Sequence, residues 1–506
     1  MVAVGVVAVI FSSAQPGISQ TTDTTAGGGN APRALVHDHA AAVESALRAL
    51  VDSKSLSSGQ IGVAVLDLGT GHLLAASNEH IALNPASNAK ILTAGAALSL
   101  LHGDHRYETM LFGTLKDGEI SGNLTIRGDG DPSLTTTDLV SMVEELRTRG
   151  VRRISGDIVV DQHFFDGETT PPAFEQQPNE WASFRAPVAA VSLNENTLQM
   201  TVRPTSPGQP AHVTFDPPGF IDQDGTVSTS ESGDSVGLAL AGSGKRMTAK
   251  ISGSVGADAK LIRYQRRVED PTLLAGFALK AALDRAGIKV QGEVKEGTVT
   301  KGTSLVSHSS RPLSELLYEV GKNSNNFYAE MVLKSLGGEK KARPARSKDG
   351  ADVVTDWLQK IGAYENGMIV KNGSGLFDSN RVTAQSIVLI LRQMALDPTV
   401  AAEFRAQLAI GGVDGTLHKR FRQADVKRLV RAKTGTLEDV ASLSGYIEGP
   451  PGKSALAFSI IINKIPGKVS AGRAAIDRFV RATVAYAHGR APEKGGGPVE
   501  EEKSAD

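Results

Sequence analysis

The sequence predicts a mixed α/β (α+β) fold in which helices cover an antiparallel sheet and a long β-rich stretch interrupts the chain. Residues 88–101 are apolar nearly all round, as in a buried central helix. Three runs near the C-terminus, 429–435, 440–447 and 455–463, are typical of successive antiparallel strands. Residues 106–300 consist mostly of short β-like runs broken by Gly, Asp and Pro. We therefore expect one domain of helices and sheet whose sequence is divided by an insertion.

The composition is that of a globular chain large enough for two or more domains. Of its 506 residues, 40% are hydrophobic and 22% are charged, which allows a sizeable core. The formal net charge of -1 gives no overall attraction to nucleic acid, so no nucleic-acid partner is predicted. Cysteine is absent, which excludes disulfides, thiolate metal sites and cysteine nucleophiles. We predict no metal and no other cofactor.

The first residues predict export. Residues 2–11 are an apolar run, and the small residues 12–14 that follow suit cleavage by signal peptidase. The run is too short to cross a bilayer as a helix, although an uncleaved interfacial anchor remains open. No lysine or arginine precedes the run, so the signal is incomplete. We expect a signal peptide at 1–14 and a location in the periplasm or cell envelope.

The remaining elements follow in order. Residues 15–36 form a polar leader that we expect to be disordered, and 37–50 have helical spacing. The runs 61–68 and 72–76 predict a β-hairpin that leads to the central helix. Six further helices are expected, at 137–149, 273–286, 313–337, 353–361, 383–396 and 471–488. The expected domains are 37–105 and 301–490 as two parts of one domain, 106–300 as an insertion of two nested subdomains, and 491–506 as a disordered tail.

The start of the central helix offers a nucleophile and a base. Ser87 precedes Lys90 by three positions, which places both side chains on one helix face. A neutral lysine amine there could take the hydroxyl proton of the serine. Neutrality requires a depressed pKa, which burial, the positive helix end and a second cation would favour. Most single matches to S-x-x-K mark an ordinary helix start with a solvated lysine, so further elements are needed.

Two later motifs supply those elements. Ser324-Asn325-Asn326 lies in a segment with helical pattern, and Lys433-Thr434-Gly435 lies in a predicted strand and is the one K-T-G in the chain. S-x-x-K, S-D-N and K-T-G in this order are the signature of class A β-lactamases and penicillin-binding proteins, with Asn in place of Asp here. Lys433 would be the second cation that Lys90 requires.

The sequence resembles one family within that group, the penicillin-binding protein 4 type D-alanyl-D-alanine carboxypeptidases of peptidase family S13. The resemblance runs from about residue 37 to residue 488. Asn372 departs from the family, which more often has aspartate there. The matching segments are Pro85-Ala86-Ser87-Asn88-Ala89-Lys90, Gly130-Asp131-Pro132, Gly156-Asp157-Ile158, Asn194-Glu195-Asn196, Lys322-Asn323-Ser324-Asn325-Asn326, Asn372-Gly373-Ser374-Gly375-Leu376, Gly415-Thr416-Leu417 and Lys433-Thr434-Gly435-Thr436.

The resemblance implies a penicillin-binding or β-lactamase-like transpeptidase domain and an exported serine D-Ala-D-Ala carboxypeptidase, with possible endopeptidase activity on crosslinks. Its partners would be peptidoglycan stem peptides ending in D-Ala-D-Ala, and β-lactams as covalent inhibitors. No oligomeric state is predicted. Ser324 follows Ser87 by 237 positions, a separation that inserted domains would produce.

The resemblance also implies roles for individual residues. Ser87 would form the acyl-enzyme and Lys90 would take its proton. Ser324 would relay a proton to the leaving amine, while Asn326 would orient Lys90. Lys433 would attract the substrate carboxylate. The remaining residues with an expected role in substrate binding are Thr434, Gly435, Thr436 and, for a diamino acid side chain of the substrate, Asp161.

Two other functions remain open. A β-lactamase or esterase could use the same scaffold, but the E-x-x-L-N motif of class A enzymes and the Y-x-N of class C enzymes are missing. A non-catalytic cell-wall-binding protein could retain the fold, which the complete motifs disfavour.

Overall fold

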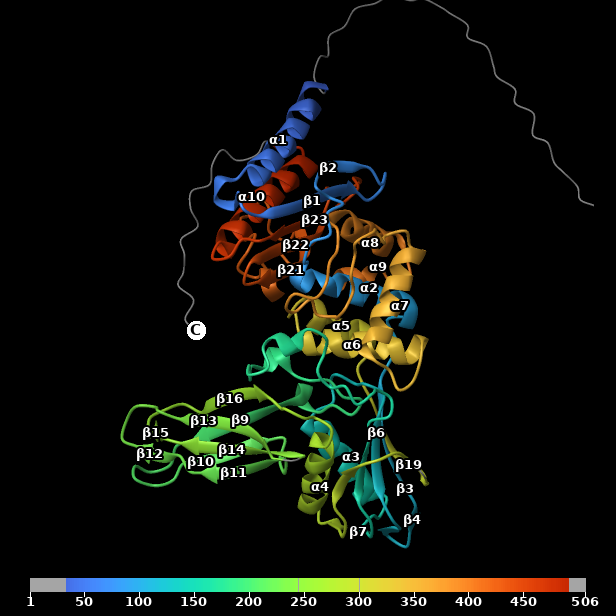
Figure 1. The fold of residues 1–506 in the computed structure, drawn as a ribbon, viewed down its shortest axis with the longest axis vertical. Coiled ribbons are helices and arrows are strands. Elements are labelled where there is room, and N and C mark those ends of the chain that lie inside the picture. The colour runs from blue at the N-terminus through green and yellow to red at the C-terminus, as the bar shows by residue number, and fades with distance from the viewer. Residues whose placement is uncertain (1–32, 244, 300, 491–506) are drawn as a thin grey trace, which may run out of the picture.

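The computed structural model describes residues 33–243, 245–299 and 301–490 (Figure 1). The predicted signal peptide at 1–14 and the predicted tail at 491–506 lie outside the described residues, as does most of the predicted leader. Within the described ranges, no helix is both long enough and apolar enough to span a membrane.

The main domain is built on a six-stranded antiparallel sheet in the order β2-β1-β23-β22-β21-β20. This sheet joins the first and last parts of the chain, because β1 pairs with β23 along its whole length. The antiparallel C-terminal strands predicted from the sequence are confirmed. The strands are β1 (Gln60–Asp67), β2 (Leu73–Ser77), β20 (Ala409–Ile410), β21 (Val430–Leu437), β22 (Val440–Ile447) and β23 (Leu456–Asn463).

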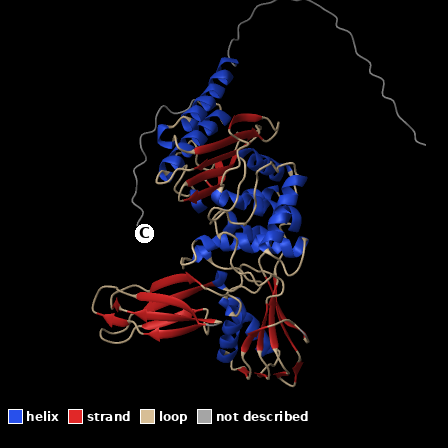
Figure 2. Ribbon diagram, in the orientation of Figure 1, coloured by secondary structure: helices blue, strands red, loops and turns tan. Residues whose placement is uncertain are grey.

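Helices cover both faces of this sheet (Figure 2). Side chains alternate along β1, so that Val63 and Val65 pack with α1 (Arg33–Val51) and α10 (Val469–Ala487), whereas Ala64 and Leu66 join the opposite core. That opposite core contains α2 (Ala89–Leu101), α5 (Leu313–Gly321), α6 (Asn326–Lys340), α7 (Ser347–Lys360), α8 (Ala384–Leu396) and α9 (Ala401–Ala406).

Helix α2 is the central helix, as predicted. Eleven of its thirteen residues are buried, and it contacts α5, α6, α7 and α8. Gly95 allows a close approach, since a Cβ atom there would lie 2.8 Å from the Trp357 ring of α7. Helix α2 is consequently packed from several sides.

The helical patterning predicted at 313–337 corresponds to two helices, not to one continuous helix. The chain forms α5 and α6, separated at residues 322–325, where Ser324 has a φ of +59°. The Asn325 side chain caps α6 by accepting a hydrogen bond from the Tyr328 N–H at 3.2 Å. The break places Ser324 and Asn326 at the start of a helix that packs on α2.

The stretch between α2 and α5 forms a separate region below the main domain in Figure 1. Helices α3 (Thr136–Thr148) and α4 (Leu274–Arg285) pack on its two sheets and confirm two predicted helices. Its five-stranded sheet includes β19, which begins after residue 300, the predicted end of the insertion. The division of the chain into domains stays a prediction. The strands are β3 (Glu108–Gly113), β4 (Leu115–Lys116), β5 (Glu119–Ile120), β6 (Leu124–Gly128), β7 (Arg153–Ile154), β8 (Ile158–Asp161), β17 (Lys289–Val290), β18 (Val294–Glu296) and β19 (Thr303–Ser309).

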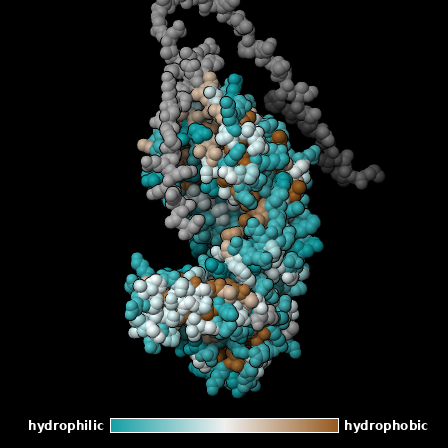
Figure 3. All heavy atoms as spheres, turned by 60° about the vertical axis from the view of Figure 1, so that its left-hand side comes forward, coloured by the Kyte–Doolittle hydropathy of each residue, from teal (hydrophilic) through white to brown (hydrophobic). Residues whose placement is uncertain are grey.

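A β-lobe extends sideways from this region, formed by β9 to β16 and labelled at the left of Figure 1. It has its own small apolar core, which includes Met200, Val202 and Ile251. Figure 3 shows that much of its surface is of intermediate hydropathy. The strands are β9 (Thr197–Arg203), β10 (His212–Asp216), β11 (Ile221–Gly225), β12 (Ser228–Ser230), β13 (Gly237–Ser243), β14 (Arg246–Ser252), β15 (Ser254–Gly256) and β16 (Ile262–Arg267).

Candidate active site

Ser87 lies in a tight turn between the main sheet and α2. The turn is one short 3₁₀ helix, Ala86–Asn88, and Ala86 has a φ of +48°, which is strained for a residue with a side chain. The Ala86 N–H donates to Asn84 Oδ1 at 2.9 Å, and Ser442 Oγ of β22 donates to the Pro85 carbonyl at 2.7 Å. These two bonds hold the serine against the sheet in a fixed orientation.

Lys90 lies next to Ser87 and is almost completely buried, with 1% of its surface exposed. Its Nζ is 3.0 Å from Ser87 Oγ, 2.7 Å from Asn326 Oδ1 and 2.8 Å from the Ser374 carbonyl oxygen. The last two groups accept hydrogen bonds, so they take two N–H groups of the amine. A neutral amine then has one lone pair left, and it faces the hydroxyl of Ser87.

The electrostatic environment favours this neutral form. Burial lowers the pKa of Lys90 from its usual value near 10.5 to about 7, although the Glu330 carboxylate opposes part of that shift. Burial and the charge of Lys90 also place the pKa of Lys433 well below its usual value. Burial therefore makes Lys90 available as a base near neutral pH.

Two further parts of the chain bring residues to Ser87 and Lys90. The start of α6 and the turn before it contribute Asn326 and Ser324, and β21 contributes Lys433. Lys433 Nζ of β21 donates to Ser324 Oγ at 2.7 Å and to the Thr434 carbonyl at 2.9 Å. Asn326 Nδ2 of α6 donates to the Phe184 carbonyl at 3.0 Å, which fixes the amide with its oxygen toward Lys90. The structure thus brings together all five residues predicted to be catalytic.

The rest of the K-T-G-T segment lines the edge of this group. Thr434 Oγ1 donates to Thr416 Oγ1 at 2.9 Å, and Thr436 Oγ1 accepts from Arg473 Nη2 at 2.9 Å. Gly435 allows β21 to approach the Ser87 turn, because a Cβ there would lie 2.1 Å from Ser442 Oγ and 2.8 Å from the Pro85 carbonyl oxygen.

Asp161, predicted to contact substrate, does not lie with these groups. It ends β8 in the inserted region and is 3% exposed. Its two carboxylate oxygens accept the N–H groups of His163 at 3.0 Å and Val299 at 2.9 Å. Because both oxygens are engaged by the backbone, the surroundings of Asp161 fit a structural role, and it has no part in the function proposed below.

Two residues that contact the site were missed by the sequence reasoning. Glu330 is buried one turn after Asn326 in α6, and an acidic residue at this spacing, flanked by the apolar residues Ala329 and Met331, was an available signal. Arg473 comes from α10, far along the chain, and no motif marks it. Asn372, the departure from the family, donates through Nδ2 to the carbonyls of Pro172 and Leu376, which an aspartate could not do.

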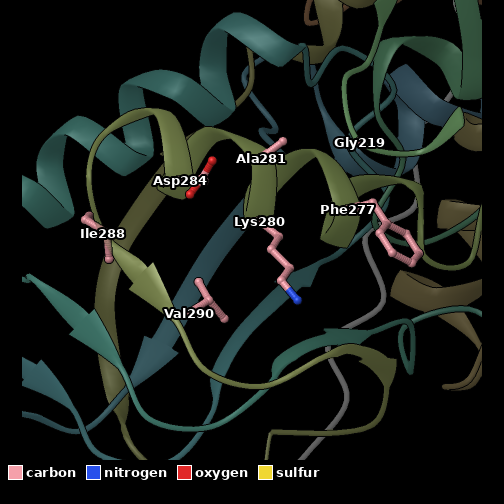
Figure 4. Close-up of a pocket in the computed structure, with 7 residues that line it drawn as sticks. All are labelled: Gly219, Phe277, Lys280, Ala281, Asp284, Ile288 and Val290. Atoms are coloured by element: carbon pink, nitrogen blue, oxygen red, sulfur yellow. The ribbon is translucent and has the colours of Figure 1, made fainter. Parts of the chain in front are cut away.

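A large pocket borders the site. It has a volume of about 700 Å³ and is lined in part by Asn84, Phe184, Leu376 and Leu437. None of the five catalytic candidates lines this pocket, but Phe184 and Asn84 do, and these two residues hydrogen-bond to Asn326 and to the Ala86 N–H. A smaller pocket of about 280 Å³ lies on α4 in the inserted region, and Figure 4 shows Phe277, Lys280 and Asp284 along it.

The fold and the site define a class of protein. A serine lies before a buried lysine at the start of a central helix, and a second serine from a helix break and a second lysine from an antiparallel strand meet beside them. This is the arrangement of serine acyl-enzymes of the penicillin-binding and β-lactamase-like type. The sequence profile of the D-Ala-D-Ala carboxypeptidase 3 (S13) family matches residues 43–483. The chain belongs to this family of serine-type peptidases, which confirms the predicted resemblance and fold class.

Individual relatives support the assignment to this family. A D-alanyl-D-alanine carboxypeptidase of Actinomadura sp. (strain R39) is 33% identical over 464 residues, which cover 88% of this chain and 85% of that protein. The D-alanyl-D-alanine carboxypeptidase DacB of Haemophilus influenzae is 27% identical over 80% of this chain and 85% of its own. The crystal structure of penicillin binding protein 4 (dacB) from Haemophilus influenzae superposes with a TM-score of 0.72 and 25% identity, covering 87% of this chain and 98% of that one.

Proposed function

We propose that this chain removes the terminal D-alanine from peptidoglycan stem peptides ending in D-Ala-D-Ala, through an acyl-enzyme on Ser87. The observation that carries the proposal is the placement of Lys90 Nζ, which is 3.0 Å from Ser87 Oγ and has acceptors for two of its hydrogens. A base with its lone pair on the nucleophile is what acylation requires.

Acylation begins when Ser87 Oγ attacks the carbonyl carbon of the penultimate D-alanine and its proton passes to Lys90 Nζ. The carbonyl oxygen becomes an oxyanion, which the backbone N–H groups of Ser87 and Thr436 stabilise. The carbon–nitrogen bond then breaks, the leaving amine takes a proton from Ser324 Oγ, and Ser324 regains a proton from Lys90, which is then neutral again. Lys433 Nζ, 2.7 Å from Ser324 Oγ, stabilises the serine during this transfer.

Hydrolysis of the acyl-enzyme completes the cycle. A water molecule attacks the ester carbonyl and gives a proton to Lys90. The bond from the carbonyl carbon to Ser87 Oγ then breaks, and Ser87 Oγ takes that proton back from Lys90 as the peptide acid is released. Asn326 stays hydrogen-bonded to Lys90 throughout and orients the amine in both half-reactions.

The hydroxyls of Thr434 and Thr436 bind the terminal carboxylate of the substrate in this proposal. Lys433 is buried and engaged by Ser324 and the Thr434 carbonyl, so it acts mainly on Ser324 and Lys90. The charge that faces the carboxylate comes instead from Arg473, which donates to Thr436 Oγ1.

The same site supports cleavage of peptide crosslinks as a second activity, because only the leaving amine differs. The pocket of about 700 Å³ gives room for a second peptide chain. A predatory peptidoglycan endopeptidase from Bdellovibrio bacteriovorus has the same fold, with a TM-score of 0.51 and 15% identity.

β-Lactams acylate Ser87 in this proposal, in support of which the Haemophilus influenzae penicillin binding protein 4 is known in complex with a β-lactam. The substrate places the enzyme outside the cytoplasm. The predicted signal peptide and periplasmic location are consistent with that and form part of the proposal.

Two assays on purified protein test the proposal. Labelling with a fluorescent penicillin should modify the wild type and not Ser87→Ala, and D-alanine should be released from a stem peptide that ends in D-Ala-D-Ala. A wild type that takes no label would contradict the acyl-enzyme. Rapid loss of the label with turnover of the drug would favour a β-lactamase instead.

A further inference from the structure

A buried carboxylate lies behind the catalytic lysine. Glu330 follows Asn326 by one turn of α6, so both side chains point to the same side of the helix. Glu330 is 2% exposed. Its Oε2 accepts the Gly373 N–H at 3.0 Å, and its Oε1 accepts the Ser374 N–H at 2.8 Å.

The turn that Glu330 holds is the one that orients Lys90. The Ser374 carbonyl accepts a hydrogen bond from Lys90 Nζ at 2.8 Å, and the Gly373 carbonyl accepts one from Thr93 Oγ1 at 2.9 Å. A Cβ on Gly373 would lie 2.3 Å from the Ala329 carbonyl oxygen, so the turn rests directly on α6. Glu330 and Lys90 therefore hydrogen-bond to the same peptide segment: Glu330 accepts from its N–H groups, and Lys90 donates to its Ser374 carbonyl.

Both carboxylate oxygens of Glu330 accept backbone N–H groups, an arrangement that suits the ionised form, although the pKa of this carboxyl is raised above its usual value. Burial raises the pKa of its carboxyl, but its hydrogen-bond partners are N–H donors and the charge of Lys90 acts in the opposite direction. Lys90 of α2 faces the carboxylate, and Lys433 of β21 in turn faces Lys90. Charged side chains on other elements packed on α6 are engaged elsewhere: Asp349 with Arg346, Lys348 with Asp352, Glu319 with Asn323, and Arg185 with the Phe174 carbonyl.

We propose that Glu330 is a positioning residue for acylation, which fixes the Ser374 carbonyl so that the Lys90 lone pair faces Ser87, and which places one negative charge beside the two lysines. The inference rests on the proposed function. Two effects follow: losing the contact to the turn disorients Lys90 and slows acylation, and losing the charge lets Lys90 give up its proton at a lower pH.

The test compares Glu330→Gln with Thr93→Val. The rate of acylation by a fluorescent penicillin is measured for both variants and the wild type across the acid and neutral pH range. The glutamine variant has one acceptor for two N–H donors and no charge, so we expect a rate between about tenfold and a hundredfold lower. The acid limb of its profile, which is the fall of the acylation rate toward low pH, should also move to lower pH. The valine variant loosens the same turn without changing a charge, and it should slow acylation while the acid limb stays in place.

The outcomes separate the possible roles. A glutamine variant that is slow but keeps the wild-type acid limb would reduce Glu330 to a packing role, and one with the wild-type rate would remove any role. Should this variant not fold, Glu330→Asp keeps the charge but shortens the side chain; we expect slower acylation with an unchanged limb, and a wild-type rate would overturn the inference. Absence of labelling in the wild type would instead contradict the proposed function itself.

Discussion

At the scale of single residues, the protonation of Lys90 controls the chemistry. The amine accepts a proton from Ser87 only when it is neutral, and its pKa is lowered to about 7 by burial. Below that pH the folded protein holds an ammonium group there, and above it a free amine. We therefore predict that the rate of β-lactam acylation rises with pH through about 7 and then levels off.

Stopped-flow labelling over a series of buffers checks this prediction, with Ser87→Ala as the control for labelling elsewhere. A rate that is flat or falls through neutral pH would mean that Lys90 is not the base.

Arg473 is the residue for which we expect an effect on substrate recognition. Its guanidinium donates to Thr436 Oγ1 at 2.9 Å, and although burial and Arg420 lower its pKa, an arginine remains a cation at neutral pH. A charge-assisted hydrogen bond contributes about 1.5–3 kcal/mol. Arg473→Ala should therefore lower kcat/KM for a D-Ala-D-Ala peptide by about tenfold to a hundredfold.

The same peptide with a C-terminal carboxamide serves as the comparison substrate, since it lacks the negative charge of the terminal carboxylate. The loss in kcat/KM should be much smaller for the carboxamide, and Arg478→Ala, an exposed change on the same helix, should leave both substrates unaffected. Equal losses for the two substrates would show that Arg473 only supports Thr436.

The catalytic candidates could be predicted from the sequence because chemistry restricts their types and order. Ser87, Lys90, Ser324, Asn326 and Lys433 belong to three short motifs, and the structure brings them together. Their roles stay a prediction until activity is measured. Glu330 and Arg473 belong to none of these motifs. The position of Glu330 one turn after Asn326 was a signal, whereas nothing in the sequence marks the contact of Arg473 with Thr436.

At the scale of elements, hydrophobic periodicity gave most helices and strands of the main domain but not their breaks. The polar run 322–325 interrupts the apolar pattern of 313–337, but nothing in the pattern reveals the left-handed backbone of Ser324. That break is forced by tertiary contacts: Lys322 Nζ binds Asp414 at 2.6 Å, and Lys433 holds the Ser324 hydroxyl. Functional sites are where local pattern and final structure are expected to disagree.

The approach of β21 to the nucleophile turn depends on Gly435. Its Cα faces Ser442 of β22, whose hydroxyl donates to the Pro85 carbonyl, and no space exists for a methyl group. Gly435→Ala should force β21 away from Ser87, which displaces the Thr436 N–H from the oxyanion. We predict acylation about a hundredfold slower and a stability loss of about 1–3 kcal/mol.

Penicillin labelling kinetics and thermal unfolding measure the two effects. Gly167→Ala is the matched control, because a Cβ there meets nothing within 4 Å. A Gly435→Ala protein that is acylated at the wild-type rate would show that the strand does not need this close approach.

At the scale of the whole molecule, the inserted region reaches the active site at several points. The Phe184 carbonyl accepts from Asn326 Nδ2 at 3.0 Å, the Pro172 carbonyl accepts from Asn372 Nδ2 at 3.0 Å, and Glu195 Oε2 accepts from Asn325 Nδ2 at 2.9 Å. The insertion is therefore a structural support for the catalytic loops as well as a separate body. The sequence indicated the insertion but could not show these contacts.

The contact through Glu195 is built on a strained segment. Asn194, Glu195 and Asn196 all have positive φ values, of 48°, 57° and 51°. Such backbone persists only where surrounding contacts enforce it, here the hydrogen bonds from the Thr136 N–H to Asn194 Oδ1 and from Asn196 Nδ2 to the Pro187 carbonyl. The strained turn presents the Glu195 carboxylate to Asn325, the residue between Ser324 and Asn326.

We predict that Glu195→Ala slows acylation about tenfold, because a partly buried amide donor left without its acceptor costs about 1–3 kcal/mol and loosens the cap of α6. Glu195→Gln keeps an acceptor oxygen and should retain most of the rate. Glu144→Ala, an exposed change on α3 of the same inserted region, should have no effect. The prediction is tested by measuring the rate of penicillin acylation for the three variants. Thermal unfolding confirms that each variant is folded. If the folded alanine variant reacted like the wild type, the inserted region would not support the catalytic loop through Glu195, and its contacts with the site would serve only to dock the two parts of the chain.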